Sequence, residues 1–271
     1  MKTTFIAIAI IFTHVSLFAQ HSLEKLWQTD TLLTTPESAL LAPNGQFLYV
    51  SSMGTKQEGS GYISKVALDG KIITKEWVRG LNANKGMGLY KGHLYVAELT
   101  AVAEIDVKTG TIVRRIPIEG AKMLNDITID AKGVVYVSDS RANKIHSIKD
   151  GQPAVYLENM DNANGLLAVG SMLYALTNGK LVQIDAQKNP TIIAEGLEGS
   201  TDGIVQVKEN EFVISGWQGI IYYVKTDGSK QVLLDTREQK SNTADIWYNA
   251  ATQTLYVPTF FKNTIVAYKL K

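Results

Sequence analysis

The chain has 271 residues, of which 45% are hydrophobic and 20% charged, so it can bury a sizeable core and lacks the composition of a disordered protein. Lys and Arg number 27 against 26 Asp and Glu, which leaves no basic field to attract nucleic acid or an anionic membrane. The absence of cysteine from the sequence excludes disulfides, thiolate metal ligands and a cysteine nucleophile, so any site chemistry depends on oxygen and histidine groups.

The first residues have the pattern of a secretory signal peptide. Lys2 precedes an apolar stretch at 5–18, and the small residue Ala19 stands where a signal peptidase would cut. Polar residues interrupt the stretch, which is too short for a comfortable membrane span. We therefore predict that residues 1–19 are removed and that the mature chain, 20–271, has no membrane span and is exported to the periplasm or secreted.

A short apolar triplet recurs along the rest of the chain. The central residues of its copies lie 46, 41, 38, 39 and 43 residues apart. A period of about forty residues, built of short apolar runs and turns, is typical of four-stranded propeller blades. We predict one all-β domain over 20–271, a six-bladed β-propeller with almost no helix. The triplets are centred on Tyr49, Tyr95, Tyr136, Tyr174, Val213 and Tyr256.

The third repeat shows the four strands of a blade most clearly. Its apolar runs lie at 127–130, 134–138, 144–148 and 154–157. The turn between the last two contains Asp150-Gly151, a pair that favours the positive φ of a tight hairpin. Other repeats carry equivalent turns at Asp69-Gly70, Thr109-Gly110 and Asp227-Gly228.

The sixth repeat has only three predicted strands, which would leave one sheet edge unpaired. The N-terminal segment 23–30 reads as an outer strand, and its Trp27 matches Trp77 in the outer strand of the first repeat. We predict that residues 23–30 supply the fourth strand of the last blade. This pairing would close the ring without a covalent link.

One position just before or at the start of each innermost strand is chemically distinctive, because six such positions surround the entrance of one central channel. Four of the six carry oxygen donors. Asn-Gly and Asp-Gly are also ordinary turn formers, which is the alternative interpretation for the fourth and fifth positions. The first position, a glutamate, has no such reason to be there. In chain order the residues are Glu37, Lys85, Asn125, Asn164, Asp202 and Ala244.

The convergence of carboxylates and amides on one axis resembles a site for a hard cation. Calcium accepts six to eight oxygen ligands, whereas zinc would need histidine or cysteine ligands that this ring lacks. The sequence therefore predicts a divalent cation, with calcium first, and a small-molecule ligand at the channel entrance.

The same residues carry a resemblance to a known family. The PES motif around Glu37, the pair Asn125-Asp126, the Asn164-Gly pair and the Asp202-Gly pair resemble those of the senescence marker protein, gluconolactonase and luciferin-regenerating enzyme family. That family consists of six-bladed propellers that hydrolyse sugar lactones and related cyclic esters. The resemblance covers all six repeats in order and spacing.

The resemblance implies roles for individual residues. Glu37, Asn164 and Asp202 match the ligands of a divalent cation, commonly calcium, and Asp202 also matches a proposed general base. Asn125 matches a residue that contacts substrate or metal-bound water, and Asp126 lies beside it. We therefore expect a metal-dependent hydrolase of a lactone or related ester.

Two residues depart from the pattern of the family. Met123 stands where sugar lactonases carry a substrate-binding arginine, which makes an apolar lactone a reasonable substrate. Lys85 places a positive charge in the ring, where it would oppose a cation but could bind a substrate carbonyl or carboxylate. We therefore include Lys85 and Met123 with Asn125 and Asp126 among the candidate substrate-binding residues.

A second class of function stays open. The segment 136–145 is also similar to the repeats of NHL-type propellers, which often serve as binding scaffolds for carbohydrate, peptide or protein. In such a scaffold the cation would be structural or absent. The sequence therefore predicts either a lactonase-type hydrolase or a non-catalytic binding propeller.

Loops that follow the second strand of a repeat supply further candidates, because they can face the same entrance. Glu98 and Asp139 are such residues, with solvated loop acids as the alternative interpretation. Trp217 and the pair Phe260-Phe261 could form an aromatic wall over a substrate, or instead a packing or dimer patch. The two histidines within the repeats are spaced neither as a metal pair nor as part of a triad, and we expect them at surface positions.

Overall fold

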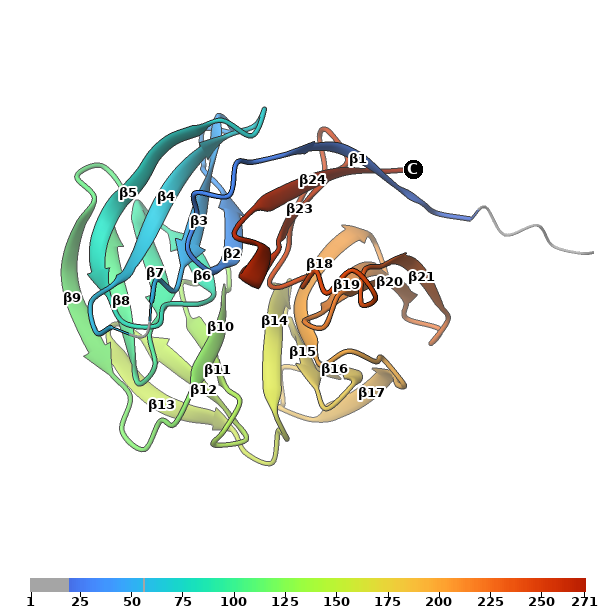
Figure 1. Ribbon diagram of the computed structural model, residues 1–271. Helices are drawn as coiled ribbons and strands as arrows, with labels where there is room; N and C mark the ends of the chain where they lie inside the picture. Colours follow the sequence, from blue (N-terminus) through green and yellow to red (C-terminus); the bar gives the residue numbers. More distant parts are fainter. Residues whose placement is uncertain (1–19, 56) are drawn as a thin grey trace, which may run out of the picture.

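The structure is a computed structural model that describes residues 20–55 and 57–271. It contains six antiparallel sheets of four strands each, arranged as blades around a central axis (Figure 1). The predicted six-bladed all-β propeller is thereby confirmed. The predicted signal peptide, residues 1–19, lies outside the described residues.

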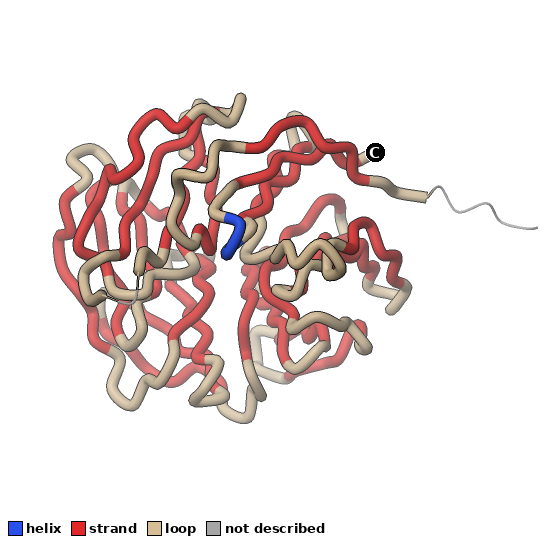
Figure 2. Tube along the Cα trace, viewed as in Figure 1, coloured by secondary structure: helices blue, strands red, loops and turns tan. Residues whose placement is uncertain are grey.

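Helical structure is nearly missing from the described part of the chain, as Figure 2 shows. The one helix assigned there is the short 3-10 helix η1 (Phe260–Lys262). No helix within 20–55 or 57–271 has the length and apolar character needed to cross a membrane.

Each blade is built from strands that follow one another from the central channel outward. Blade 1 contains β2 (Pro36–Leu41), β3 (Phe47–Ser52), β4 (Gly61–Ala67) and β5 (Ile72–Leu81). Blade 2 contains β6 (Met87–Tyr90), β7 (His93–Ala97), β8 (Ala101–Asp106) and β9 (Thr111–Pro117). Blade 3 contains β10 (Leu124–Ile129), β11 (Val135–Asp139), β12 (Lys144–Lys149) and β13 (Gln152–Leu157).

The second half of the ring repeats this order, with one exception in the last blade. Blade 4 contains β14 (Ala163–Val169), β15 (Met172–Thr177), β16 (Lys180–Ile184) and β17 (Pro190–Ala194). Blade 5 contains β18 (Thr201–Lys208), β19 (Glu211–Gly216), β20 (Ile220–Lys225) and β21 (Lys230–Asp235). Blade 6 contains β22 (Trp247–Asn249), β23 (Thr254–Pro258), β24 (Ile265–Leu270) and, as its outer strand, β1 (Leu23–Gln28).

The N-terminal strand closes the ring as predicted. β1 pairs antiparallel with β24, with Leu23 opposite Leu270 and Gln28 opposite Val266 (Figure 1). The edge that β24 would otherwise leave open is therefore paired over the length of β1. Two segments separated by almost the whole chain thus complete one sheet.

The two tryptophans matched in the sequence occupy equivalent places. Trp27 on the outer strand of blade 6 covers Gly70, a turn glycine of blade 1, where an added side-chain carbon would lie 2.7 Å from the indole. Trp77 on the outer strand of blade 1 covers Gly110 of blade 2 in the same way, at 2.8 Å. Both glycines have positive φ, so these turns need glycine for conformation as well as for space.

The apolar core is divided among the blade interfaces. Six clusters of buried residues occur within 20–55 and 57–271, and each joins residues of two neighbouring blades. In the cluster between blades 1 and 2, for example, Tyr49 and Ile63 meet Leu94 and Ile105. Face-to-face packing of neighbouring sheets therefore fixes the angle between blades and holds the inner strands around the channel.

Candidate functional site

The six positions singled out in the sequence lie at one end of the central channel, which we call the mouth. Four of them are the second residues of the innermost strands β2, β10, β14 and β18. The other two lie two or three residues before β6 and β22. The mouth layer therefore consists of Glu37, Lys85, Asn125, Asn164, Asp202 and Ala244.

Glu37 is buried, with 3% of its surface exposed, and its two oxygens have different surroundings. Oε1 lies 3.7 Å from the Nζ of Lys85, whereas Oε2 is buried without any hydrogen-bond partner. Burial raises the pKa of Glu37 well above its ordinary value, the nearby positive charge of Lys85 opposes this shift, and the negative charge of Asp202 adds to it. The carboxyl group is thus desolvated and only partly compensated.

Asn164 and Asp202 form the opposite part of the mouth layer. The Asn164 side-chain amide donates to Asp202 Oδ1 at 2.9 Å and to the Thr201 carbonyl at 3.2 Å. Asn164 Oδ1 is then left buried without a partner. Burial raises the pKa of Asp202 to about 6, although the charge of Lys85 and the Asn164 hydrogen bond both act to lower it.

The unpartnered oxygens of Glu37 and Asn164 provide a test of whether a cation fits. Buried oxygens without hydrogen-bond donors are costly unless another positive group satisfies them. Together with the Asp202 carboxylate they form the mixed carboxylate and amide set that calcium accepts. No three His, Cys, Asp or Glu side chains gather as a metal-binding group in the described ranges, so a cation here would depend on the Asn164 amide as its third ligand.

Asn125 also faces the mouth but is held by its neighbours. Its amide donates to Ser140 Oγ at 3.0 Å, and Ser140 in turn donates to the Ala163 carbonyl at 2.7 Å. The amide group is therefore oriented by a chain of bonds from blade 3 to blade 4. The predicted contact of Asn125 with a ligand at the mouth stays a prediction.

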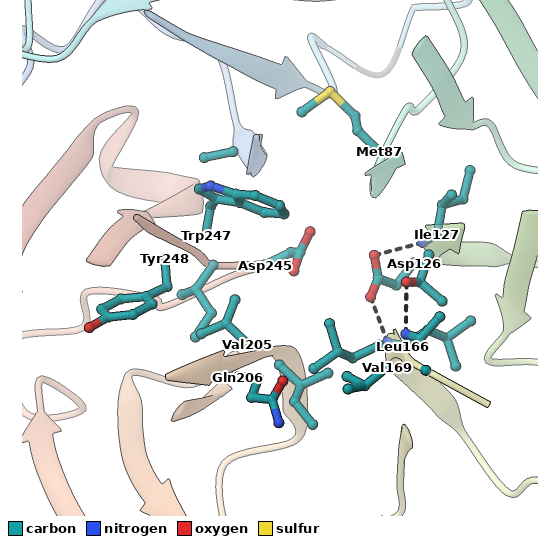
Figure 3. Close-up of a pocket in the computed structure, with 17 residues that line it drawn as sticks. Met87, Asp126, Ile127, Leu166, Val169, Val205, Gln206, Asp245, Trp247 and Tyr248 are labelled. Carbon is teal, nitrogen blue, oxygen red and sulfur yellow. Dashed lines mark hydrogen bonds between the residues drawn. The ribbon is translucent and has the colours of Figure 1, made fainter. Parts of the chain in front are cut away.

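Asp126, predicted as a substrate-binding residue, lies one layer deeper and is bonded to the backbone. Its Oδ2 accepts from the Leu166 N–H at 2.6 Å, and its Oδ1 accepts from the Ile127 N–H at 2.6 Å. Asp245 faces it across a cavity of about 500 Å³, as Figure 3 shows. Burial raises the pKa of both carboxyl groups well above the ordinary value.

Asp245 was missed in the sequence, although a signal for it existed. Asp245 follows the mouth residue Ala244 in the sequence, as Asp126 follows Asn125. Because Ala244 is apolar, the sequence pattern did not mark the next residue as part of a site. Asp245 Oδ2 accepts from Ser38 Oγ at 2.5 Å, and the Asp245 N–H donates to the Glu37 carbonyl at 2.9 Å. Asp245 therefore joins blade 6 to blade 1 directly below Glu37.

The glycines after three mouth residues do not serve as turn formers, which was the alternative interpretation of the Asn-Gly and Asp-Gly pairs. Gly86, Gly165 and Gly203 all lack positive φ. A side-chain carbon on Gly203 would lie 2.5 Å from the Ile246 nitrogen of the next blade, and one on Gly86 would lie 2.7 Å from a neighbouring Cα. These glycines permit close approach of adjacent inner strands and so bring the mouth residues together.

The loop acids Glu98 and Asp139 are buried rather than solvated, and both anchor loops. Asp139 accepts hydrogen bonds from the N–H groups of Lys122, Met123 and Ala142 at 2.8–2.9 Å. Although burial alone would raise it, these bonds hold the pKa of Asp139 below its ordinary value. Asp139 thus fixes the backbone of the segment that carries Met123, two residues before Asn125.

Glu98 has the same kind of role between blades 1 and 2. It accepts from the Asn82 N–H at 2.8 Å and pairs with Arg115 Nε at 2.7 Å. His146, expected at the surface, is buried and lies 3.7 Å from Asp139. It sits inside a blade because its strand, β12, is covered on both faces.

An aromatic cluster lies over the loops of blades 5 and 6. Trp217 meets Phe260 and Phe261 edge to face, with ring centroids 5.4 and 5.8 Å apart, and Phe261 is 65% exposed. The following Asn263 accepts from the Thr35 N–H at 3.0 Å, two residues before Glu37. Figure 1 shows η1 beside β2, so the cluster borders the mouth.

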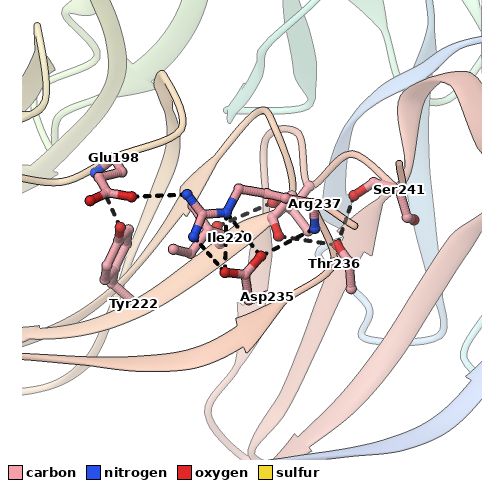
Figure 4. Close-up of polar contacts among 9 residues, drawn as sticks. Glu198, Ile220, Tyr222, Asp235, Thr236, Arg237 and Ser241 are labelled. Carbon is pink, nitrogen blue, oxygen red and sulfur yellow. Dashed lines mark hydrogen bonds and ion pairs between the residues drawn. The ribbon is translucent and has the colours of Figure 1, made fainter. Parts of the chain in front are cut away.

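The loop that leads to Asp202 is anchored by an arginine (Figure 4). Arg237 pairs with Glu198 at 2.9 Å and with Asp235 at 2.6 Å. The Glu198 N–H donates to the Tyr222 hydroxyl at 3.1 Å. These contacts restrain the chain segment just before β18, which leads to Asp202.

Comparisons with known proteins bear on the fold. No protein-family model and no curated protein sequence matches the chain. A gluconolactonase from Xanthomonas campestris has a TM-score of 0.70 at 15% identity, covering 88% of this chain and 87% of its own. A virginiamycin B lyase from Staphylococcus aureus, solved with quinupristin, has a TM-score of 0.65 at 11% identity, covering 93% and 100%.

A streptogramin B lyase is similar to the same extent, with a TM-score of 0.70 at 13% identity over 93% of this chain and 98% of its own. The expected similarity to gluconolactonases is therefore confirmed at the level of the fold. Identities this low show the propeller arrangement and leave the chemistry to the residues of the mouth.

Proposed function

We propose that the chain is an exported hydrolase that opens a lactone or related cyclic ester at the mouth, with a divalent cation, calcium first, as its cofactor. The observation that carries the proposal is the pair of buried, unpartnered oxygens on Glu37 and Asn164 beside Asp202. Export is inferred from the sequence pattern of residues 1–19.

Glu37, Asn164 and Asp202 would hold the cation through their side-chain oxygens. When bound, such an ion supplies Lewis acidity toward a substrate carbonyl and lowers the pKa of a bound water. The two carboxylates offer two negative charges to a doubly charged ion. The rigid inner strands keep these three side chains in place before the cation or the substrate binds.

Asp202 is the residue best placed to move a proton. In the cation-free protein its pKa of about 6 leaves it ionised at neutral pH, which is the state that can accept a proton from water. Asp202 would accept a proton from water as the water oxygen bonds to the ester carbonyl carbon. When the ring C–O bond breaks, protonated Asp202 would give that proton to the departing alkoxide oxygen. The products are then a hydroxy acid, which ionises in solution, and an ionised Asp202.

The walls of the mouth favour a substrate with an apolar body. Met123 stands where a sugar lactonase would carry an arginine, and Trp217 and Phe261 add apolar surface at the border of the mouth. Asn125 and Lys85 supply polar groups for the carbonyl end of the substrate. Asp126 is less suited to contact substrate because both its oxygens already accept backbone hydrogen bonds.

A lyase reaction is less well supported by the residues present. The lyase solved with quinupristin was inactivated by replacing a histidine with alanine. Within 20–55 and 57–271 the histidines are His21, His93 and His146, and none belongs to the mouth layer. The donors of this mouth are carboxylates, amides and one ammonium group.

Calcium binding and lactone turnover test the proposal together. In chelator-treated protein, calorimetric titration with CaCl2 should show one site that Asn164→Ala removes. Asp202→Asn should lower kcat of hydrolysis of an alkyl-substituted lactone by about 10²- to 10⁴-fold, the usual contribution of a positioned base. Turnover would be followed by titrating the released acid.

Asp227→Asn is the matched control, because Asp227 also precedes a glycine but lies exposed in an outer turn. It should leave binding and turnover unchanged. Hydrolysis that survives both chelation and the two mouth substitutions would contradict the mechanism. Calcium binding without any lactone turnover would instead favour the non-catalytic binding propeller.

A further inference from the structure

Lys85 is the one mouth residue with a positive charge, and it already contacts a proposed cation ligand. Its Nζ lies 3.7 Å from Glu37 Oε1, and the side chains are 12% and 4% exposed. A charge pair this far from solvent interacts more strongly than one at the surface. Its field also reaches Asp202, since burial raises the pKa of both Glu37 and Asp202 and the Lys85 charge opposes that rise at each of them.

The backbone of Lys85 is fixed, whereas its side chain can change direction. The Lys85 N–H donates to the Ala97 carbonyl at 2.9 Å, and the Gly86 N–H donates to the Asn125 carbonyl at 3.0 Å. Beyond Glu37, the polar atom that the ammonium group meets is the Met53 thioether sulfur, at 3.8 Å, which is a weak acceptor. The flexible four-carbon stem can therefore carry the charge away from Glu37 without disturbing the inner strand.

The ammonium group and a divalent cation make opposing demands on Glu37. With Lys85 in place, Glu37 and Asp202 carry two negative charges against one positive charge. A doubly charged ion at the same carboxylates would bring a total of three positive charges together. Repulsion between the ion and an ammonium group still bound to Glu37 would then weaken binding.

We propose that Lys85 is a built-in counter-ion of Glu37 that a divalent cation must displace. The inference rests on the cation site proposed above and concerns what sets its affinity. Displacement makes the site weak, so that it fills only at the roughly 10⁻⁴ to 10⁻³ M affinity typical of extracellular calcium modules. The displaced ammonium group would then face the open mouth, where substrate binds.

Calcium affinity measured without substrate tests this directly. Calorimetric titration of chelator-treated protein with CaCl2 should give a dissociation constant about tenfold or more lower for Lys85→Met than for the wild type, because one like charge is removed. Lys85→Arg keeps the charge and should bind as weakly as the wild type. Lys149→Met, on an exposed position of β12, is the matched control for loss of a surface charge.

The wild-type chain provides a second measurement that needs no substitution. A water-soluble acetylating ester should modify Lys85 slowly in calcium-free protein and several-fold faster in saturating CaCl2, as followed by peptide mass spectrometry. Acceleration confined to Lys85 supports displacement, and an unchanged Lys85 rate at saturating calcium overturns it.

The outcomes separate this inference from the cation site itself. Equal calcium affinity in wild type and Lys85→Met, with binding lost in Glu37→Gln, would leave the cation site standing and refute the role of Lys85. Binding seen only in Lys85→Met would support the inference in its strongest form. No calcium binding in the wild type or in either Lys85 variant would refute both.

Discussion

Two adjacent layers of the channel use similar residues for different purposes. In the mouth layer, Glu37 and Asn164 keep buried oxygens without partners. In the next layer down, which we call the seam layer, polar groups bond across to neighbouring blades. The seam layer consists of Ser38, Gly86, Asp126, Gly165, Gly203 and Asp245.

The difference shows that buried acidity alone does not identify a site. Asp126 and Glu37 both have a pKa raised well above the ordinary value by burial. Both carboxyl oxygens of Asp126 accept hydrogen bonds from backbone N–H groups. One of these donors, the Leu166 N–H at 2.6 Å, belongs to the next blade. Glu37 retains an oxygen that only a ligand could satisfy, so the count of hydrogen bonds separates a binding carboxylate from a structural one.

The largest expected effect on stability comes from adding a side chain to a glycine of the seam layer. Gly203→Ala should lower the free energy of unfolding by about 2–3 kcal/mol, because its methyl group would overlap the backbone of Ile246. Gly92→Ala is the control, since Gly92 has open space and only a positive φ, which costs about 1 kcal/mol. Urea unfolding followed by tryptophan fluorescence would measure both, and equal losses would argue against tight seams.

An intermediate effect concerns pH, through Asp245. Burial raises its pKa, and the charges of Asp126 and Asp202 add to the shift. The folded chain therefore holds a proton more tightly than the unfolded chain, whose aspartates titrate at about 3.9. The protonated Asp245 therefore makes its full contribution to the free energy of unfolding below that pH. The contribution is lost as pH rises through the higher pKa of the folded state.

Asp245→Asn should consequently flatten the fall of Tm between acid and neutral pH in chelator, since an amide does not ionise. Its carbonyl oxygen can still accept the Ser38 hydrogen bond. Asp227→Asn, at an exposed outer turn, should leave the slope nearly unchanged. Parallel Tm profiles for wild type and Asp245→Asn would show that the seam carboxyl is not held protonated.

The smallest effect is expected at the rim of the mouth. Phe261→Ala removes an exposed ring, so the free energy of unfolding should change by no more than about 0.5 kcal/mol. KM for an alkyl-substituted lactone should rise by about two- to tenfold while kcat stays constant, because the ring contributes equally to binding of the ground state and of the transition state. Val155→Ala, an exposed apolar residue on β13, serves as the control. A fall in kcat instead would place Phe261 closer to the reacting atoms.

Much of the fold followed from periodicity in the sequence. The repeat of Tyr49 and its counterparts set the number of blades, and the match of Trp27 to Trp77 located the closing strand correctly. In the third repeat the four predicted strands differ from β10–β13 by no more than three residues at any end. Local turn chemistry and alternation carry this information because each blade is built from contiguous chain.

The candidate site was predictable only in position. The sequence placed Glu37, Asn164 and Asp202 at one end of the channel, but not which oxygens would remain free. The contact of Lys85 with Glu37 and the role of Asp245 depend on how neighbouring blades pack. Such contacts between distant segments leave no local pattern in a single sequence.

The pairing of β1 with β24 also has a consequence for how the molecule is made. Residues 23 and 270 meet in this pair, so blade 6 must wait until nearly the whole chain has been synthesised. Until then an early strand without its partner presents a free edge that other chains can join. Ring closure is thus expected to be the slow, late event of folding, and conditions that delay it should favour aggregation over assembly of the mouth.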